Sequence, residues 1–229
     1  MMDYLNTKAK PVLVFLFSLI FLGVFSVTTL LLHQSFVWTW HWLLAAGVVM
    51  MLLAIPCHIA GRKSQLFYLV SFLFNSIASG CSVSAYYAAT HTAVTFVEML
   101  LGLVPAAAVL LLAYAAIQIY SKTKRFALTI CTVLIVALLI VAVVFWAKGE
   151  SQLFSFGFFS LFIALFYIGV FGVTVNHDER SVFRDISFGG FGSFIILTVV
   201  VAVILSEGDI LDGADLSGGG GGKKNRRAK

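Results

Sequence analysis

Seven long apolar runs alternate with short polar stretches along the chain. They cover residues 11–32, 42–60, 66–89, 94–119, 126–147, 152–175 and 186–206, and none of them contains a lysine or an arginine. A helix of about 20 apolar residues is long enough to cross the hydrocarbon core of a bilayer, which is about 30 Å thick. The pattern therefore predicts seven transmembrane helices.

The composition sets the class of protein. Hydrophobic residues make up 61% of the chain and charged residues 11%, whereas about 25% of the residues in soluble domains are charged. In lipid, backbone polar groups must be satisfied within a helix or a closed barrel, and runs of this length lack the alternation of barrel strands. We therefore predict an all-α polytopic membrane bundle over residues 11–206, with an N-terminus of residues 1–10 and a flexible, Gly-rich, basic-ended tail of residues 207–229.

Basic residues mark one side of the predicted bundle. Nine of them precede the first run or lie between runs two and three, four and five, or six and seven: Lys8, Lys10, Arg62, Lys63, Lys122, Lys124, Arg125, Arg180 and Arg184. The other three connections contain Lys148 alone. Short cytoplasmic loops are enriched in Lys and Arg, so we predict a plasma-membrane protein with a cytoplasmic N-terminus and, after seven spans, an outer C-terminus. The basic cluster of the tail begins at Lys223, too far from the last run to weigh much in this rule.

This distribution also accounts for the net charge of +5. The predicted cytoplasmic side has nine basic and four acidic residues, and the charges on the rest of the chain cancel. No basic patch interleaved with aromatic residues remains, so no nucleic-acid partner is expected.

The third run is polar on two of its three helical faces. At 100° per residue, the first polar face consists of Ser71, Asn75, Ser79, Ser82 and Tyr86. The second consists of Ser76, Gly80, Ser84, Tyr87 and His91, and the apolar face of Phe74, Ile77, Ala78, Cys81 and Ala85. We expect this helix at the centre of the bundle, with only its apolar face available to lipid. Its polar residues either join helices or line a path for a solute or ion.

Glu98 is an acidic residue set inside a predicted span. It shares a helical face with small residues such as Gly102, Ala106 and Ala113, which predicts that it points into the protein. A carboxylate inside the membrane is costly, and is therefore a candidate functional group. Glu98 is either a proton or cation group or an interfacial carboxylate hydrogen-bonded to the third span.

Three histidines lie on the same predicted side as Glu98. His33 and His41 flank the connection between the first two runs, and His91 follows the third. Imidazole and carboxylate groups bind zinc, so His33, His41, His91 and Glu98 are candidate metal ligands. No local motif fixes any two of them together.

The sequence contains no signature of a nucleotide site, a nucleophile elbow or a zinc protease, so we assign no catalytic residue and no cofactor. The first functional interpretation is a small-solute or ion transporter or channel-like protein. Its path follows the third span through Asn75, Ser79, Ser82 and Tyr86, with Glu98 as the proton or cation group. The second is a non-catalytic membrane scaffold or partner protein, in which the polar residues only join helices.

A third interpretation is an intramembrane enzyme in which His91 and Glu98 act as acid and base on a lipid head group. The expected partners are membrane lipid and a small solute or ion. The sequence does not identify a protein partner.

Overall fold

All regular secondary structure in the described part of the chain is α-helical. The computed structural model describes residues 9–34, 39–119, 124–147, 152–176 and 181–217. Its helices are α1 (Ala9–Gln34), α2 (Trp40–Ala60), α3 (Gln65–Ala89), α4 (Phe96–Ile119), α5 (Lys124–Ala147), α6 (Gln152–Asn176) and α7 (Val182–Ser217). The predicted all-α class is confirmed.

The helices follow the predicted spans, with two differences. Six of them contain an apolar segment long enough to cross a membrane, whereas the described apolar part of α5, Leu128–Val144, is shorter. The last span was expected to end at residue 206, and its apolar part does end at Ser206, but α7 continues as a helix to Ser217. Polarity ends a membrane span without ending a helix, because helical hydrogen bonds join backbone groups and do not require apolar side chains. The stronger stop signal in the sequence is the glycine run that begins at Gly218.

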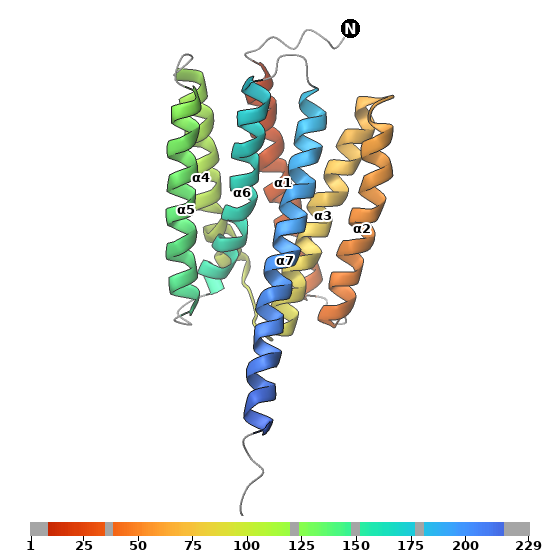
Figure 1. Cartoon of the computed structure of the whole chain (residues 1–229), viewed down its shortest axis with the longest axis vertical. Helices are drawn as coiled ribbons and strands as arrows, with labels where there is room; N and C mark the ends of the chain where they lie inside the picture. Colours follow the sequence, from red (N-terminus) through yellow and green to blue (C-terminus); the bar gives the residue numbers. More distant parts are fainter. Residues whose placement is uncertain (1–8, 35–38, 120–123, 148–151, 177–180, 218–229) are drawn as a thin grey trace, which may run out of the picture.

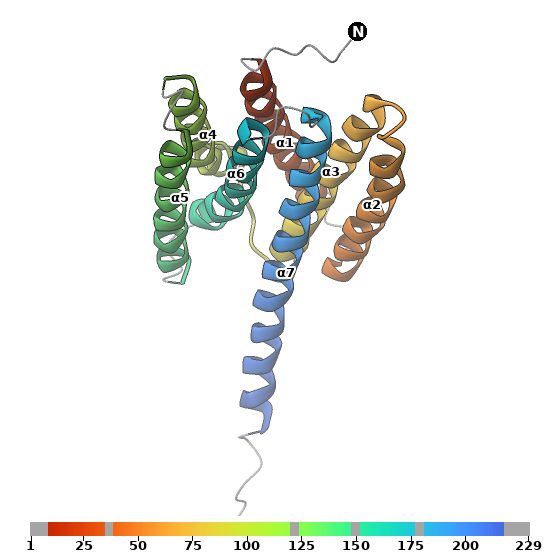
Figure 2. The same ribbon diagram turned by 45° about the horizontal axis from the view of Figure 1, so that its top comes forward.

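Consecutive helices run in opposite directions, so α1, α3, α5 and α7 all begin at the same end of the bundle (Figure 1). We call it the Arg62 end, because the turn between α2 and α3 contains Arg62 and Lys63. The connection between α3 and α4 lies at the opposite end, which we call the His91 end. Lys10 and Arg184, in the first turns of α1 and α7, also lie at the Arg62 end. The last part of α7 extends beyond the other helices at the His91 end (Figures 1 and 2).

Two groups of helices form the bundle. In the first, α3 packs against α1, α2 and α7; in the second, α6 packs against α4 and α5. Contacts of α1 and α7 with α6 join the two groups. Helices α2 and α5 form opposite edges of the bundle (Figures 1 and 2). The third span is therefore central to the first group, between α1, α2 and α7, whereas α6 and α1 lie between the two groups.

The bundle has hydroxyl groups inside and large apolar side chains outside. Ser79 and Ser160 are fully buried, whereas Leu31, Val133 and Phe188 are each more than 60% exposed. An apolar surface of this extent favours aggregation in water, but in a bilayer it meets acyl chains that are as apolar as leucine. The distribution is that of a membrane-embedded bundle.

Close contact between α1 and α3 depends on Gly80. A Cβ atom added at Gly80 would lie 2.6 Å from the Thr28 Cβ and 3.0 Å from the Phe25 carbonyl oxygen. Neither atom is the end of a flexible side chain, so the helices would have to move apart. Small residues at such crossings let membrane helices pack closely.

Gly80→Ala should therefore destabilise the protein. We expect a loss of about 1–3 kcal/mol, the usual effect of overpacking, which exceeds the gain of about 1 kcal/mol in helix propensity. Thermal unfolding of the purified protein in detergent measures the change. Gly23→Ala is the matched control, because no described atom of a neighbouring helix lies within 4 Å of a Cβ placed there. Equal melting temperatures for the two variants would contradict the close contact.

Candidate functional site

The first polar face of α3 packs against α7. Ser187 Oγ donates a hydrogen bond of 3.0 Å to Ser71 Oγ, and Ser82 Oγ lies 2.8 Å from Thr198 Oγ1. Between these two pairs, a Cβ added at Gly190 of α7 would lie 3.1 Å from the Asn75 Cβ. We call this contact the α3–α7 seam: Ser71, Asn75, Ser79 and Ser82 on α3, and Ser187, Gly190 and Thr198 on α7.

The other two faces of α3 are also covered. On the second polar face, Ser84 Oγ lies 3.4 Å from the Thr29 carbonyl oxygen of α1. The prediction that the apolar face is available to lipid is wrong for Ala78, Cys81 and Ala85, which are buried, whereas Phe74 and Ile77 are partly exposed. Gly47 allows α2 to approach there, since a Cβ at Gly47 would lie 3.2 Å from the Ala78 carbonyl oxygen.

Most hydroxyl groups of α3 are satisfied within their own helix. Ser76, Ser79, Ser82 and Ser84 each donate to the carbonyl oxygen four residues earlier, over 2.8–3.3 Å. This local bond lets a serine be buried without a partner on another helix. The number of buried serines is therefore only weak evidence for a path through the bundle.

Asn75 differs from the serines because part of its amide is unsatisfied. Its Nδ2 donates to the Ser71 carbonyl oxygen over 2.9 Å, which fixes the orientation of the amide. Its Oδ1 is buried and has no hydrogen-bond donor among the described residues. A buried polar group without a partner costs about 1–3 kcal/mol. Asn75 is therefore the residue of the predicted path that has a buried acceptor without a partner among the described residues.

A second unsatisfied group lies on the other side of the same segment of α7. The hydroxyl of Tyr167, on α6, is buried without a hydrogen-bond partner among the described residues. Its ring is 3.7 Å from a Cβ added at Gly189, the neighbour of the Gly190 that contacts Asn75. The Phe21 ring contacts the Tyr167 ring at 5.4 Å between centroids and lies 3.4 Å from a Cβ at Gly190. An unpaired acceptor and an unpaired hydroxyl thus flank one short segment of α7.

A hydrogen-bonded chain extends the seam toward the Arg62 end. Since Ser187 donates to Ser71, it accepts from His58 Nδ1 of α2, which lies 2.9 Å away. The His58 ring packs edge-on against the Tyr68 ring, with 5.2 Å between centroids. His58 is not among the predicted site residues, because it lies in the last turn of an apolar run and its partner is 129 positions away. Its polarity within that run was the available signal.

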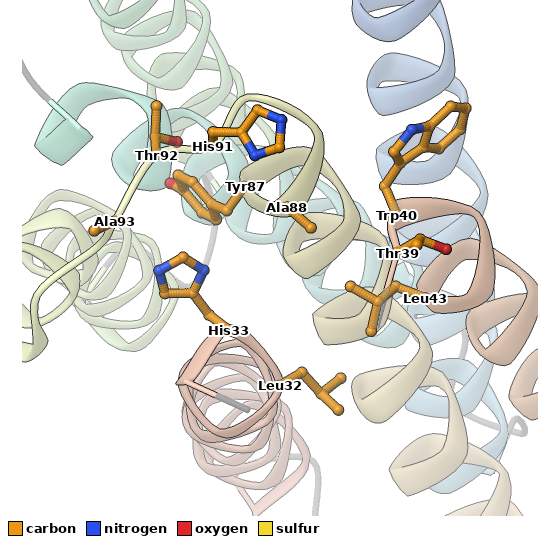
Figure 3. A pocket seen from close by; sticks show the side chains of 10 residues that line it. All are labelled: Leu32, His33, Thr39, Trp40, Leu43, Tyr87, Ala88, His91, Thr92 and Ala93. Atoms are coloured by element: carbon orange, nitrogen blue, oxygen red, sulfur yellow. The ribbon is translucent and has the colours of Figure 1, made fainter. Parts of the chain in front are cut away.

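A cavity of about 390 Å³ opens at the His91 end between α1, α2 and α3. Its walls consist of Leu32, His33, Thr39, Trp40, Leu43, Tyr87, Ala88, His91, Thr92 and Ala93 (Figure 3). Pockets of 300–1,000 Å³ are large enough for small organic molecules. Tyr87 lies one residue after Tyr86 of the predicted path, whereas Asn75, Ser79 and Ser82 do not line this cavity.

The two tyrosines connect α3 with α6 beside the cavity. Tyr87 is fully buried and its hydroxyl lies 2.8 Å from Ser155 Oγ. The Tyr86 ring packs against Phe159, with 5.3 Å between centroids, and against the Tyr87 ring, with 5.1 Å. Because Ser82 lies one turn of α3 farther from the His91 end, the tyrosine pair lies between that end and the seam.

His33 and His91 reach this cavity from α1 and from the connection after α3 (Figure 3). His33 Nε2 accepts a 3.3 Å hydrogen bond from the Val94 backbone N–H, so in the neutral ring the proton is on Nδ1. His41 is exposed and stacks on Trp40, with 3.4 Å between centroids. In the described part of the chain no three His, Cys, Asp or Glu side chains come together as a metal site requires.

His91 has a backbone φ of 51°, which is uncommon for a residue other than glycine. Such a conformation costs about 1–3 kcal/mol and persists where the surrounding structure requires it. Strained residues of this kind occur often at ligand sites, so the conformation of His91 is consistent with a ligand site in the cavity.

Glu98 lies at the start of α4 and forms a capping box with Thr95. Its Oε2 accepts hydrogen bonds from the Thr95 backbone N–H, over 2.9 Å, and from Thr95 Oγ1, over 2.8 Å. The Glu98 backbone N–H is 3.3 Å from Thr95 Oγ1. This reciprocal arrangement satisfies two N–H groups at a helix start. Glu98 thus bonds to its own helix start and not to α3 in these contacts, and a role with protons or cations remains a prediction.

Comparison with protein-family models, with curated proteins and with solved structures finds no match to this chain. The fold and the surface define the class: an apolar, all-helical, membrane-embedded bundle. The α3–α7 seam and the cavity are the two features that bear on a more specific function.

The capping box predicts different effects for two substitutions. Thr95→Val keeps the shape of the side chain but removes the cap, and should cost about 1 kcal/mol of stability. Glu98→Gln should leave stability almost unchanged, because glutamine also serves in a capping box. Thermal unfolding in detergent measures both. A large loss of stability in Glu98→Gln would show that the charge of Glu98 is needed elsewhere.

Proposed function

We propose that the chain is a multi-pass plasma-membrane protein with seven spans, a cytoplasmic N-terminus and an outer C-terminus. Lys10, Arg62, Lys63 and Arg184 all lie at the Arg62 end, which supports a cytoplasmic location for that end. This proposal counts α5 as a span, in addition to the six helices whose apolar segments are long enough to cross a membrane. Its 24 residues are as many as those of α4.

Reporter fusions test the seventh span and the orientation together. A reporter attached after Ile119 should lie in the cytoplasm, and one attached after Ala147 should lie outside, because α5 crosses the membrane between these positions. In a bacterial host, alkaline phosphatase is active only outside the cytoplasm and green fluorescent protein fluoresces only inside it. Each position should therefore give a signal with one reporter and none with the other. The same side for both positions would remove α5 from the spans, and reversed readings would invert the bundle.

We infer that the protein transports or conducts a small solute or ion along the α3–α7 seam. The observation that carries this proposal is the Asn75 amide: its Oδ1 is fully buried and unpaired among the described residues, and the Asn75 side chain packs against Gly190 through its Cβ and Cγ atoms. Native proteins rarely leave such an acceptor without a partner. A passing solute, ion or water is a partner that the proposed function supplies.

The seam is closed in this conformation. Asn75, Ser79 and Ser82 are all 0% exposed, so passage requires α7 to move away from α3. The two helices contact each other through Gly190 and through hydroxyl pairs such as Ser82 with Thr198. Each interhelical hydrogen bond contributes only about 0.6–2 kcal/mol. Breaking such a bond and replacing it with a hydrogen bond to a solute therefore costs little energy.

The cavity at the His91 end serves as the first binding place in this proposal. It is open to the outside of the bundle and contains both polar and aromatic side chains. The Tyr86–Tyr87 pair then acts as the barrier between the cavity and the seam. Tyr87 lines the cavity, and Tyr86 belongs to the predicted path.

A non-catalytic scaffold is the second candidate function, and the serine bonds favour it. Ser76, Ser79, Ser82 and Ser84 already have a partner in their own helix, and Ser82 and Ser84 also contact neighbouring helices. In this alternative the polar residues stabilise the bundle and nothing crosses it. Transport measurements distinguish the two functions.

Flux into liposomes containing the purified protein should depend on Asn75. We expect faster entry of at least one probe, among glycerol, urea, potassium ions and protons, than into empty liposomes. Asn75→Leu should reduce that flux about tenfold or more, since loss of one guest contact of about 1.4 kcal/mol has that effect. Ser76→Ala is the matched control, because it removes a buried hydroxyl of the same helix that lies on another face. Shrinkage or swelling and fluorescent indicators measure the rates.

Two outcomes would contradict transport through the seam. Equal rates for protein-containing and empty liposomes with all probes would favour the scaffold. Equal flux in wild type and Asn75→Leu would exclude the path. Melting temperatures of the variants separate loss of flux from loss of fold, and flux through Glu98→Gln tests the predicted proton or cation role of Glu98.

A further inference from the structure

A groove between α6 and α7 lies near the Arg62 end, on the opposite side of α7 from the seam. It has a volume of about 340 Å³, and its walls include Phe166, Gly169 and Val173 of α6 and Arg184, Phe188 and Gly192 of α7. Both helices contain apolar segments long enough to span a membrane. The groove plays no part in the proposed transport path.

The groove opens toward the outer surface of the bundle. Phe188 is 71% exposed and Val173 is 38% exposed. No described atom of a neighbouring helix lies within 4 Å of a Cβ placed at Gly169. At this depth the surroundings of a span are acyl chains, so the apolar part of the groove is exposed to the tails of lipids.

The groove also extends from the membrane surface into the hydrocarbon. Arg184 is in the first turn of α7, whereas Gly192 is eight residues farther, or about 12 Å along the helix axis. Arginine near a span end lies at the level of lipid head groups, while the glycines and phenylalanines lie at the level of the tails. The two ends of the groove therefore match the two parts of a phospholipid.

Charge at the mouth of the groove favours a phosphate. The guanidinium group of arginine binds phosphate oxygens through two parallel hydrogen bonds. Asp185 is also part of the wall, but it is 7% exposed, whereas Arg184 is exposed. Of these two charges, the cation is therefore the more accessible at the membrane surface. Arg62 and Lys63 lie at the same end of the bundle, in the turn between α2 and α3, and add to the positive charge of that end.

We propose that this groove is a binding site for an anionic phospholipid, with one acyl chain between α6 and α7 and the phosphate on Arg184. In the orientation proposed above, the lipid belongs to the cytoplasmic leaflet. The site requires only the spans α6 and α7, so it does not depend on transport through the seam.

Lipid binding to the full-length protein in detergent, followed by native mass spectrometry, tests the site. The probes are phosphatidylglycerol and phosphatidylcholine with the same acyl chains. The wild type should retain one phosphatidylglycerol more strongly than phosphatidylcholine. Arg184→Gln should bind phosphatidylglycerol about tenfold more weakly, the scale of one charge-assisted contact, and lose the preference.

Filling the groove tests the place of the acyl chain. Gly169→Phe puts a ring into the open groove, and should abolish retention of both lipids. Gly23→Phe is the matched control, because Gly23 is also an exposed glycine of a span with no described neighbouring helix within 4 Å of an added Cβ. Circular dichroism and the melting temperature show whether each variant is folded.

Three results would overturn the proposal. The first is a wild type that retains no lipid beyond the level of detergent exchange. The second is unchanged lipid retention in folded Gly169→Phe, or the same loss in Gly23→Phe. The third is an unchanged preference for phosphatidylglycerol in Arg184→Gln. These three results concern lipid retention alone, whereas the liposome flux of wild type and Asn75→Leu tests the seam, so this site and the proposed function fail separately.

Discussion

The structure depends on one constraint, which is that every polar group in a hydrocarbon environment needs a partner inside the protein. The hydroxyls of α3 meet this constraint mainly through the carbonyl oxygen one turn earlier in the same helix. Serines can therefore be buried at the centre of the bundle while leucines and valines face outward. Their small size also lets α1 and α7 approach α3, so the same residues satisfy polarity and permit close packing.

Asn75 shows where this solution reaches its limit. An amide has two donors and two acceptor lone pairs, and the α3 backbone satisfies the Nδ2 side while Oδ1 stays unpaired among the described residues. A serine at this position would use the carbonyl oxygen of Ser71 as the other serines do. Packing alone therefore explains the Asn75 amide less well than it explains the serines, so Asn75 distinguishes a path from a packed interface better than the number of polar residues does.

The sequence predicted the helices well because length and hydropathy determine a membrane span, and the boundaries of α2, α3 and α5 agree to within two residues. It also placed α3 among other helices, as its contacts with α1, α2 and α7 show, since two polar faces cannot both face lipid. Burial of the third face under α2 could not be predicted, because it depends on Gly47 meeting Ala78 from another helix. The hydrogen-bonded chain from His58 through Ser187 to Ser71 could not be predicted either, because its residues are far apart in the sequence. The Thr95–Glu98 capping box, by contrast, could have been predicted from the T-x-x-E pattern. Glu98 was instead interpreted as a carboxylate inside a span.

Helix α7 links the two sites, because its glycines face both of them. Gly190 contacts Asn75 at the seam, whereas Gly189 contacts Val170 and Gly192 contacts Phe166 on the α6 side, where the groove lies. If α7 moves to open the seam, as the transport proposal requires, the same movement would change the width of the groove. A lipid that bound more tightly to one position of α7 would then favour that position, and by linkage a solute in the seam would change the affinity for the lipid by the same factor. In a bundle without a soluble domain between its spans, this shared helix is a direct route by which the surrounding membrane can act on the path.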